Sequence, residues 1–174
     1  MIQALVFVLV LLLSAFGAYS QKAADFSGKW TLDVAKSKLG DRNSIESQTM
    51  TVTQTAAELK VSTETKRTAP AAGGGRGFGG GGGDAAMTYA LDGKETKTER
   101  SGPNGAIPVM LKAKADGGKL WLSQSSTFSG PNGEITSTTK ETWELGADGK
   151  SLTVTTERTT PRGTDTTTKI YSKG

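Results

Sequence analysis

The chain of 174 residues contains no cysteine and no histidine. Without cysteine there is no disulfide framework, no thiolate nucleophile and no cysteine-ligated metal. Without histidine, the commonest metal ligand and the commonest general base near neutral pH are both missing. Zinc hydrolases, zinc fingers and histidine-dependent catalytic triads are therefore excluded. We expect a protein that is not an enzyme and that uses no catalytic residue, no metal and no cofactor.

Apolar residues are also scarce, at 34% of the chain, whereas glycine (23 residues) and threonine are abundant. Threonine is β-branched and suits strands, and glycine breaks helices and marks turns. The composition therefore favours an all-β fold, and the length favours a single domain. The net charge of +4 is too small to indicate a polyanionic partner.

The first twenty residues are predicted to be a signal peptide. Residues 4–13 read ALVFVLVLLL, a run too short for a membrane-spanning helix and typical of a signal-peptide core. Small residues at Ala18 and Ser20 predict cleavage before Gln21, although no basic residue precedes the run, and an N-terminal membrane anchor is the alternative. We expect residues 21–174 to form a secreted or periplasmic domain without a membrane span. The lack of disulfides favours a bacterial export.

Two kinds of turn signal alternate along the rest of the chain. Asp92-Gly93, Asp116-Gly117 and Asp148-Gly149 are strong hairpin signals. Between them, Ser101–Gly105 and Ser129–Gly133 both read Ser-Gly-Pro-Asn-Gly, and Pro161-Arg-Gly163 resembles them. We predict a single up-and-down antiparallel β-barrel of about 8–10 strands, with one kind of turn at each end. The expected strands are 28–34, 45–55, 58–68, 86–91, 94–100, 106–115, 118–128, 134–145, 150–159 and 165–172, with a possible short helical turn at 35–42.

Cross-strand pairs follow from these turns, because successive side chains point to opposite faces of a strand. The predicted pairs are Leu120 with Trp143, Trp143 with Leu152, Leu122 with Glu141, and Val154 with Ile170. The resulting face is apolar near the Asp-Gly turns and polar toward the other end of the strands. We therefore predict a packed base below a more polar cavity. The alternative is that the polar halves of the strands project beyond the core and are solvated.

The base is predicted to be structural and to consist of Gly28, Trp30, Leu120, Trp143 and Leu152. The candidate ligand-binding residues above it are Arg67, Tyr89, Leu122, Gln124, Glu141, Val154, Thr156 and Arg158. Arg67 and Arg158 would orient an acidic group of a ligand, with a solvated rim position as the alternative. Glu141 has apolar neighbours, so it either pairs with an inward basic side chain or is turned outward by a β-bulge. We favour the bulge.

The opening of the first strand carries a resemblance to known barrels. Phe26-Ser-Gly-Lys-Trp-Thr-Leu32 resembles the Gly-x-Trp signature of lipocalins, fatty-acid-binding proteins and related calycin barrels. The longer run to Lys38 is similar to the opening of small secreted bacterial lipocalin-like proteins. The resemblance implies a closed barrel with Trp30 in its base. Lys169-Ile-Tyr171 is similar to the Arg-x-Tyr pair with which fatty-acid-binding proteins hold a carboxylate, but the predicted register turns Ile170 inward and its two neighbours outward.

Residues 73–83 read GGGRGFGGGGG. A flexible hairpin connection is the favoured interpretation, and the alternative is an arginine-glycine segment that contacts nucleic acid through Arg76 and Phe78. We expect no nucleic-acid partner. The loop could instead act as a flap over the barrel mouth, with Phe78 as its apolar contact. Trp121 faces away from its apolar neighbours and is predicted to be exposed.

These patterns together predict a protein that binds a small hydrophobic or amphipathic ligand inside a β-barrel. The alternative is a cell-envelope or protein-interaction module with a filled barrel, whose loops or outer face form the contacts.

Overall fold

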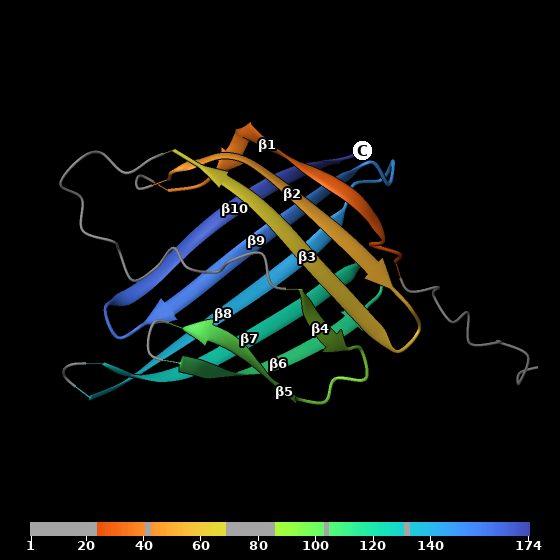
Figure 1. Ribbon diagram of the computed structural model, residues 1–174. Helices are drawn as coiled ribbons and strands as arrows, with labels where there is room; N and C mark the ends of the chain where they lie inside the picture. The colour runs from red at the N-terminus through yellow and green to blue at the C-terminus, as the bar shows by residue number, and fades with distance from the viewer. Residues whose placement is uncertain (1–23, 41–42, 69–85, 103–104, 131–132) are drawn as a thin grey trace, which may run out of the picture.

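The computed structural model describes residues 24–40, 43–68, 86–102, 105–130 and 133–174. Within them, ten strands form one antiparallel sheet in the order β4-β3-β2-β1-β10-β9-β8-β7-β6-β5 (Figure 1). The strands are β1 (Gly28–Lys38), β2 (Ile45–Gln54), β3 (Glu58–Arg67), β4 (Met87–Ala90), β5 (Thr96–Gly102), β6 (Gly105–Asp116), β7 (Lys119–Gly130), β8 (Gly133–Leu145), β9 (Ser151–Thr160) and β10 (Gly163–Lys173). The described residues contain no helix of the length and apolarity that a membrane span requires.

The sheet folds back on itself into a nearly closed up-and-down barrel. Strands β1 to β3 run diagonally across the front of Figure 1, over β6 to β10 behind them. Pairing of β1 with β10 joins the two halves. The sheet ends at β4 and β5, and it closes near the Asp92-Gly93 turn, where β4 packs against β6 and Asp92 forms a single bridge to Lys114 on β6. The predicted all-β, up-and-down barrel is therefore confirmed.

An apolar core fills the end of the barrel that carries the Asp-Gly turns. Trp30, Leu59 and Leu120 are fully buried, and Trp143 packs edge-on against Phe26 with ring centroids 6.1 Å apart. The other buried apolar side chains come from alternate strand positions and include Leu32, Met50, Val52, Tyr89, Val109, Leu111, Ala113, Leu122, Leu152, Val154 and Tyr171. Burial of this apolar area is the main favourable term that holds the sheet closed.

Gly28 shows why glycine precedes Trp30 at the base. Its φ of 137° lies in a region that side chains rarely adopt, and an added Cβ would meet the Lys173 Cε atom at 2.6 Å. The Lys173 ammonium lies 5.1 Å from the centroid of the Trp30 ring, a cation–π contact. Glycine therefore lets the two ends of the described domain close over the tryptophan.

Two of the Asp-Gly turns, at Asp92 and Asp148, are stabilised by their own carboxylates. The backbone N–H of Lys94 donates to Asp92 Oδ1 at 2.9 Å, and that of Lys150 donates to Asp148 Oδ1 at 2.9 Å. These bonds hold the pKa of both carboxyl groups below the ordinary value. The intervening Gly149 has φ 64°, a conformation that glycine adopts without strain.

The pairing of β7 with β8 was predicted correctly, with Leu120 opposite Trp143 and Leu122 opposite Glu141. The predicted pairing of β8 with β9 was wrong by two residues, because Val154 and not Leu152 lies opposite Trp143. The connection occupies residues 146–150, and Gly146 N–H donates to the Ser151 carbonyl at 2.9 Å. A shift of two residues keeps each side chain on its predicted face.

The predicted pairing of β9 with β10 was wrong by one residue, which has a larger consequence. Val154 lies opposite Lys169, and Ile170 lies opposite Thr153. The turn holds two residues, Pro161 and Arg162, because Gly163 pairs directly with Thr160. A shift of one residue exchanges the two faces of a strand. Lys169 and Tyr171 therefore face the interior, and Ile170 faces outward.

The expected helical turn at 35–42 is wrong for the residues that are described, up to Gly40. Strand β1 continues to Lys38, with an irregularity between Asp33 and Lys38. There, Ser37 Oγ donates to the Asp33 carbonyl at 2.6 Å and accepts from the backbone N–H of Ile170 at 2.9 Å. The bulged segment thus remains bound to β10, which keeps it in the sheet.

Candidate functional site

A network of polar side chains lies inside the barrel, centred on the buried Gln48 of β2. Tyr171 Oη donates to Gln48 Oε1 at 2.7 Å, and Lys169 Nζ donates to the same oxygen at 3.1 Å. Gln48 Nε2 donates to Thr65 Oγ1 of β3 at 2.8 Å. The interior thus has an ammonium group and a phenol that converge on one carbonyl oxygen.

Glu141 lies on the same inner surface, so the predicted outward bulge is wrong. The ladders of β8 with β7 and with β9 continue through this residue without a shift. Its carboxylate accepts from Trp143 Nε1 at 2.8 Å and from Thr156 Oγ1 at 3.5 Å. A buried carboxylate is tolerated where hydrogen-bond donors and positive charge compensate for lost water. Trp143, Thr156 and the nearby Lys169 ammonium supply both.

Burial determines the protonation of this interior. It raises the pKa of Tyr89 and Tyr171, and the Glu141 carboxylate raises both further. Burial also lowers the pKa of Lys169. The negative charge of Glu141 raises this pKa, and the positive charge of Arg67 lowers it further. The two phenols therefore stay neutral hydrogen-bond donors well above neutral pH.

The predicted ligand-binding residues divide by depth. Tyr89, Leu122 and Val154 are buried, Gln124, Glu141, Thr156 and Arg158 are half-buried, and Arg67 is exposed. Arg67 lies at the rim, where its Nη1 is 3.4 Å from Ser44 Oγ. Arg158 faces inward opposite Thr139, which in turn lies opposite Gln124. Gln124 and Arg158 thus lie nearer the mouth, whereas Glu141 and Thr156 lie in the same cross-strand row as the buried Leu122.

The predicted base residues Trp30, Leu120, Trp143 and Leu152 are all fully buried, whereas Trp121 is 38% exposed. Residues 1–20 and the glycine-rich segment 73–83, with Arg76 and Phe78, lie outside the described residues.

Sequence reasoning did not identify the interior polar side chains Gln48 and Arg100, and it placed Lys169 and Tyr171 on the outer face. A signal existed for Gln48, because it shares the face of Met50 and Val52 at alternate positions of one strand. The inward orientation of Lys169 and Tyr171 could be predicted only with the correct length of the Pro161-Arg162 turn. Arg100 lies near the C-terminal end of β5, opposite Ile107. Its Nη2 atom is 3.5 Å from Ser126 Oγ.

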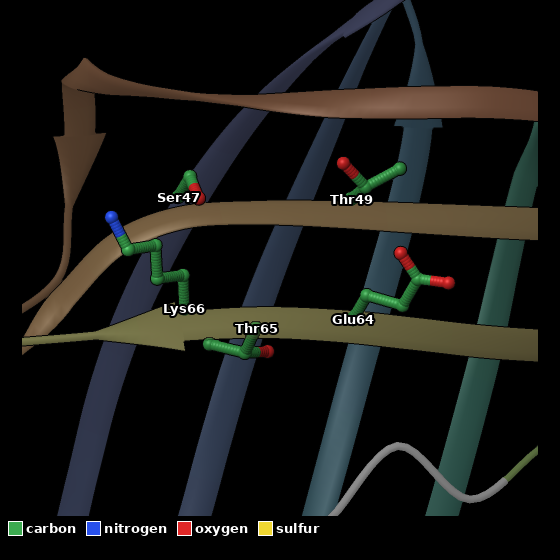
Figure 2. A pocket seen from close by; sticks show the side chains of 5 residues that line it. All are labelled: Ser47, Thr49, Glu64, Thr65 and Lys66. Carbon is green, nitrogen blue, oxygen red and sulfur yellow. The ribbon is translucent and has the colours of Figure 1, made fainter.

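A shallow open hollow also lies on the outer surface, over β2 and β3 (Figure 2). Ser47 and Thr49 alternate with the buried Gln48 and therefore point outward, and Glu64 and Lys66 lie opposite them. Lys66 forms an exposed ion pair with Glu46 at 2.8 Å. Exposed pairs of this kind contribute little. The remaining lining residue, Thr65, is half-buried and lies opposite the inward-facing Gln48, to which it is hydrogen-bonded.

The described residues are therefore a nearly closed ten-stranded barrel with an apolar base and a polar, hydrogen-bonded inner wall above it. No protein-family model and no curated protein matches the chain. Among solved structures, it is similar to zebrafish ileal bile acid-binding protein, crystallised in complex with cholic acid. That similarity has a TM-score of 0.47 and 16% sequence identity, and it covers 86% of this chain and 98% of that chain.

Proposed function

We propose that this protein binds a small amphipathic molecule with an acidic group inside its barrel, and that it acts without catalysis. The acidic group is held by Lys169 and Tyr171, and the apolar part lies against Leu122, Val154 and Tyr89. We further propose that the domain works after export, on the strength of the apolar run at residues 4–13.

One observation carries the proposal: Tyr171 Oη and Lys169 Nζ both donate to Gln48 Oε1, at 2.7 and 3.1 Å. This amide oxygen occupies a position suited to an oxygen acceptor between a phenol and an ammonium group. A carboxylate is a stronger acceptor than an amide, because charge-assisted hydrogen bonds are about twice as strong as neutral ones. An acidic ligand can therefore take the place of Gln48 at these two donors.

The charge of the inner wall favours the same class of ligand. Among the described residues, four basic side chains face the interior or its rim: Arg67, Arg100, Arg158 and Lys169. The acidic side chains described there are Glu141 and, exposed at the rim, Asp165. Glu141 is already hydrogen-bonded by Trp143 and Thr156. The excess of basic groups attracts an anion, and the buried apolar side chains below provide a surface for its hydrocarbon part.

The direct test compares binding of dodecanoic acid and dodecanol, which differ in the acidic group. We expect Lys169→Met and Tyr171→Phe each to weaken dodecanoate binding about tenfold or more, the effect of a lost hydrogen bond to a charged group. Binding of dodecanol should change little. Isothermal titration calorimetry of the full chain measures both affinities.

Lys140→Met is the matched control, because Lys140 lies on β8 and is exposed on the outer surface. It should leave both affinities unchanged. The proposal fails if Lys169→Met binds dodecanoate as tightly as the unaltered protein. It also fails if the unaltered protein binds neither probe, a result that favours the interaction module with a filled barrel.

Glu141→Gln gives a prediction of opposite sign. The substitution removes a negative charge from the inner wall and keeps an oxygen that can accept from Trp143 Nε1. We expect dodecanoate to bind about threefold to tenfold more tightly, because ~1 kcal/mol of repulsion at an effective dielectric constant near 20 is lost. Unchanged or weaker binding in the same titration would show that Glu141 does not oppose the ligand's charge.

A further inference from the structure

Strand β5 presents two buried polar atoms that have no hydrogen-bond partner among the described residues: Arg100 Nε and Thr96 Oγ1. Such atoms are rare in folded proteins, and each calls for an explanation, often a ligand or water. Arg100 is the more costly of the two, because its guanidinium is always charged. The inner surface of β5 is therefore a candidate for a second contact with a ligand.

The position of Arg100 follows from the strand register. Arg100 lies opposite Ile107 on β6, Thr98 lies opposite the buried Val109, and Val109 lies opposite Ser126 on β7. The Arg100 side chain crosses β6 on the inner surface, since its Nη2 is 3.5 Å from Ser126 Oγ. This single contact is long for a hydrogen bond and involves a neutral hydroxyl. The guanidinium thus lies inside the barrel with most of its donors uncommitted among the described residues.

Arg100 also lies on the wall opposite Lys169 and Tyr171. In the sheet order, β5 is five strands from β10 by way of β6 to β9, and β4 lies four strands from β10 on the other side. With strands about 4.8 Å apart and tilted by roughly 40°, a ten-stranded barrel is roughly 20 Å across between backbones. A ligand that contacts both Arg100 and Lys169 must therefore reach from one wall of the barrel to the other.

We propose that Arg100 forms a second anion-binding subsite, so that the ligand carries an acidic group at each end of an apolar segment. The ligand class is then an α,ω-dicarboxylate or an equivalent bipolar molecule. One acid binds Lys169 and Tyr171, and the other binds the Arg100 guanidinium, whose fork of donors matches a carboxylate. This inference rests on the proposed function for the first acid and adds the second.

The test compares dicarboxylic acids of increasing length, from hexanedioic to dodecanedioic acid, with the monocarboxylic acids of equal length. We expect diacids of intermediate length to bind the unaltered protein best. Arg100→Gln should weaken binding of the best diacid about tenfold or more and change monoacid binding less than about twofold. Arg100→Lys, which keeps the charge, should retain part of the diacid affinity. Lys97→Gln, on the outer surface of the same strand, is the matched control and should change neither affinity.

Each failure points to a different step. If Arg100→Gln changes the binding of neither acid, the second subsite does not exist and the proposed function stands. If it weakens monoacids and diacids equally, Arg100 contacts the same acidic group as Lys169 and Tyr171, and the second subsite does not exist. If neither acid binds the unaltered protein, the proposed function itself fails. If Arg100→Gln abolishes monoacid binding while Lys169→Met does not, the acidic group binds at β5, and the assignment to Lys169 is wrong. Circular dichroism checks that Arg100→Gln and Arg100→Lys are folded. If one of them is not, the other is used for the comparison of binding.

Discussion

Replacing Trp30 by alanine is expected to lower the free energy of unfolding by about 3–5 kcal/mol, the usual cost of deleting a buried aromatic side chain. The Trp30 side chain is 0% exposed, and its Nε1 donates to the Phe26 carbonyl at 2.9 Å. Alanine would leave a cavity in the base of the barrel and a carbonyl oxygen without its donor. Small domains have only about 5–15 kcal/mol of stability, so the variant should unfold at a much lower urea concentration or fail to fold.

Trp121→Ala is the matched control, because it deletes the same side chain from another strand. Trp121 is 38% exposed on the outer surface of β7. We expect its loss to change stability by about 0.5 kcal/mol or less. Equal losses for the two variants in urea unfolding would contradict the assignment of Trp30 to the packed base.

At alkaline pH, we expect the protein to unfold as Tyr89 and Tyr171 are forced to ionise. Burial, with a smaller contribution from Glu141, raises the pKa of both phenols above their ordinary value of 10.0. In the unfolded chain each phenol loses its proton near pH 10, so above that pH the unfolded state binds fewer protons than the native state. The stability that the neutral phenols confer is complete below pH 10 and then falls by about 1.4 kcal/mol per pH unit for each phenol.

Lys169 acts in the opposite direction over a neighbouring range. Its pKa is lowered in the native state, so stability rises with pH between that lowered value and 10.5, the ordinary value for lysine. One lysine opposes two tyrosines, and the net effect at high pH is a loss of stability.

The measurement follows tyrosinate absorbance and circular dichroism in one alkaline titration. Tyr89 and Tyr171 should ionise together with loss of the folded signal, and Tyr171→Phe should reduce the dependence of stability on pH by about half. Full tyrosinate absorbance near pH 10 in a protein that is still folded would contradict the burial of these phenols.

The strand count was predictable because its determinants are local. An aspartate followed by glycine satisfies the turn's own backbone, as Asp92 and Asp148 do through the N–H groups of Lys94 and Lys150. Alternation of apolar and polar residues then fixes the faces of each strand. The pairing of Leu120 with Trp143 follows from these two rules without knowledge of any distant contact.

The position of Glu141 was not predictable, because its compensation depends on register. Trp143 is two residues away on the same face of the same strand, which the sequence shows. Thr156 lies directly opposite Glu141 only in the true pairing of β8 with β9, two residues from the predicted one. A carboxylate with no known partner is correctly expected to avoid burial, so the error in register led to the error in orientation.

The polar network around Gln48 could not be predicted because its contacts join distant parts of the chain. Gln48 is 121 residues from Lys169 and 123 residues from Tyr171 along the chain. These contacts exist only because β1 pairs with both β2 and β10, which brings the first and last parts of the domain together. No local pattern marks such a contact. A shorter turn at Pro161 than expected also placed these two side chains on the wrong face in the prediction.

The packing of β4 against β6 determines where the barrel can change its diameter. Nine strand pairs carry the backbone ladders of the described sheet, and none of them joins β4 to β5. Between the two ends, the described residues provide the bridge of Asp92 with Lys114 and the packing of β4 against β6. Widening the barrel at this join leaves all nine ladders intact. We therefore expect the described barrel to widen at this join at lower cost than a barrel whose ladders run without interruption around its circumference.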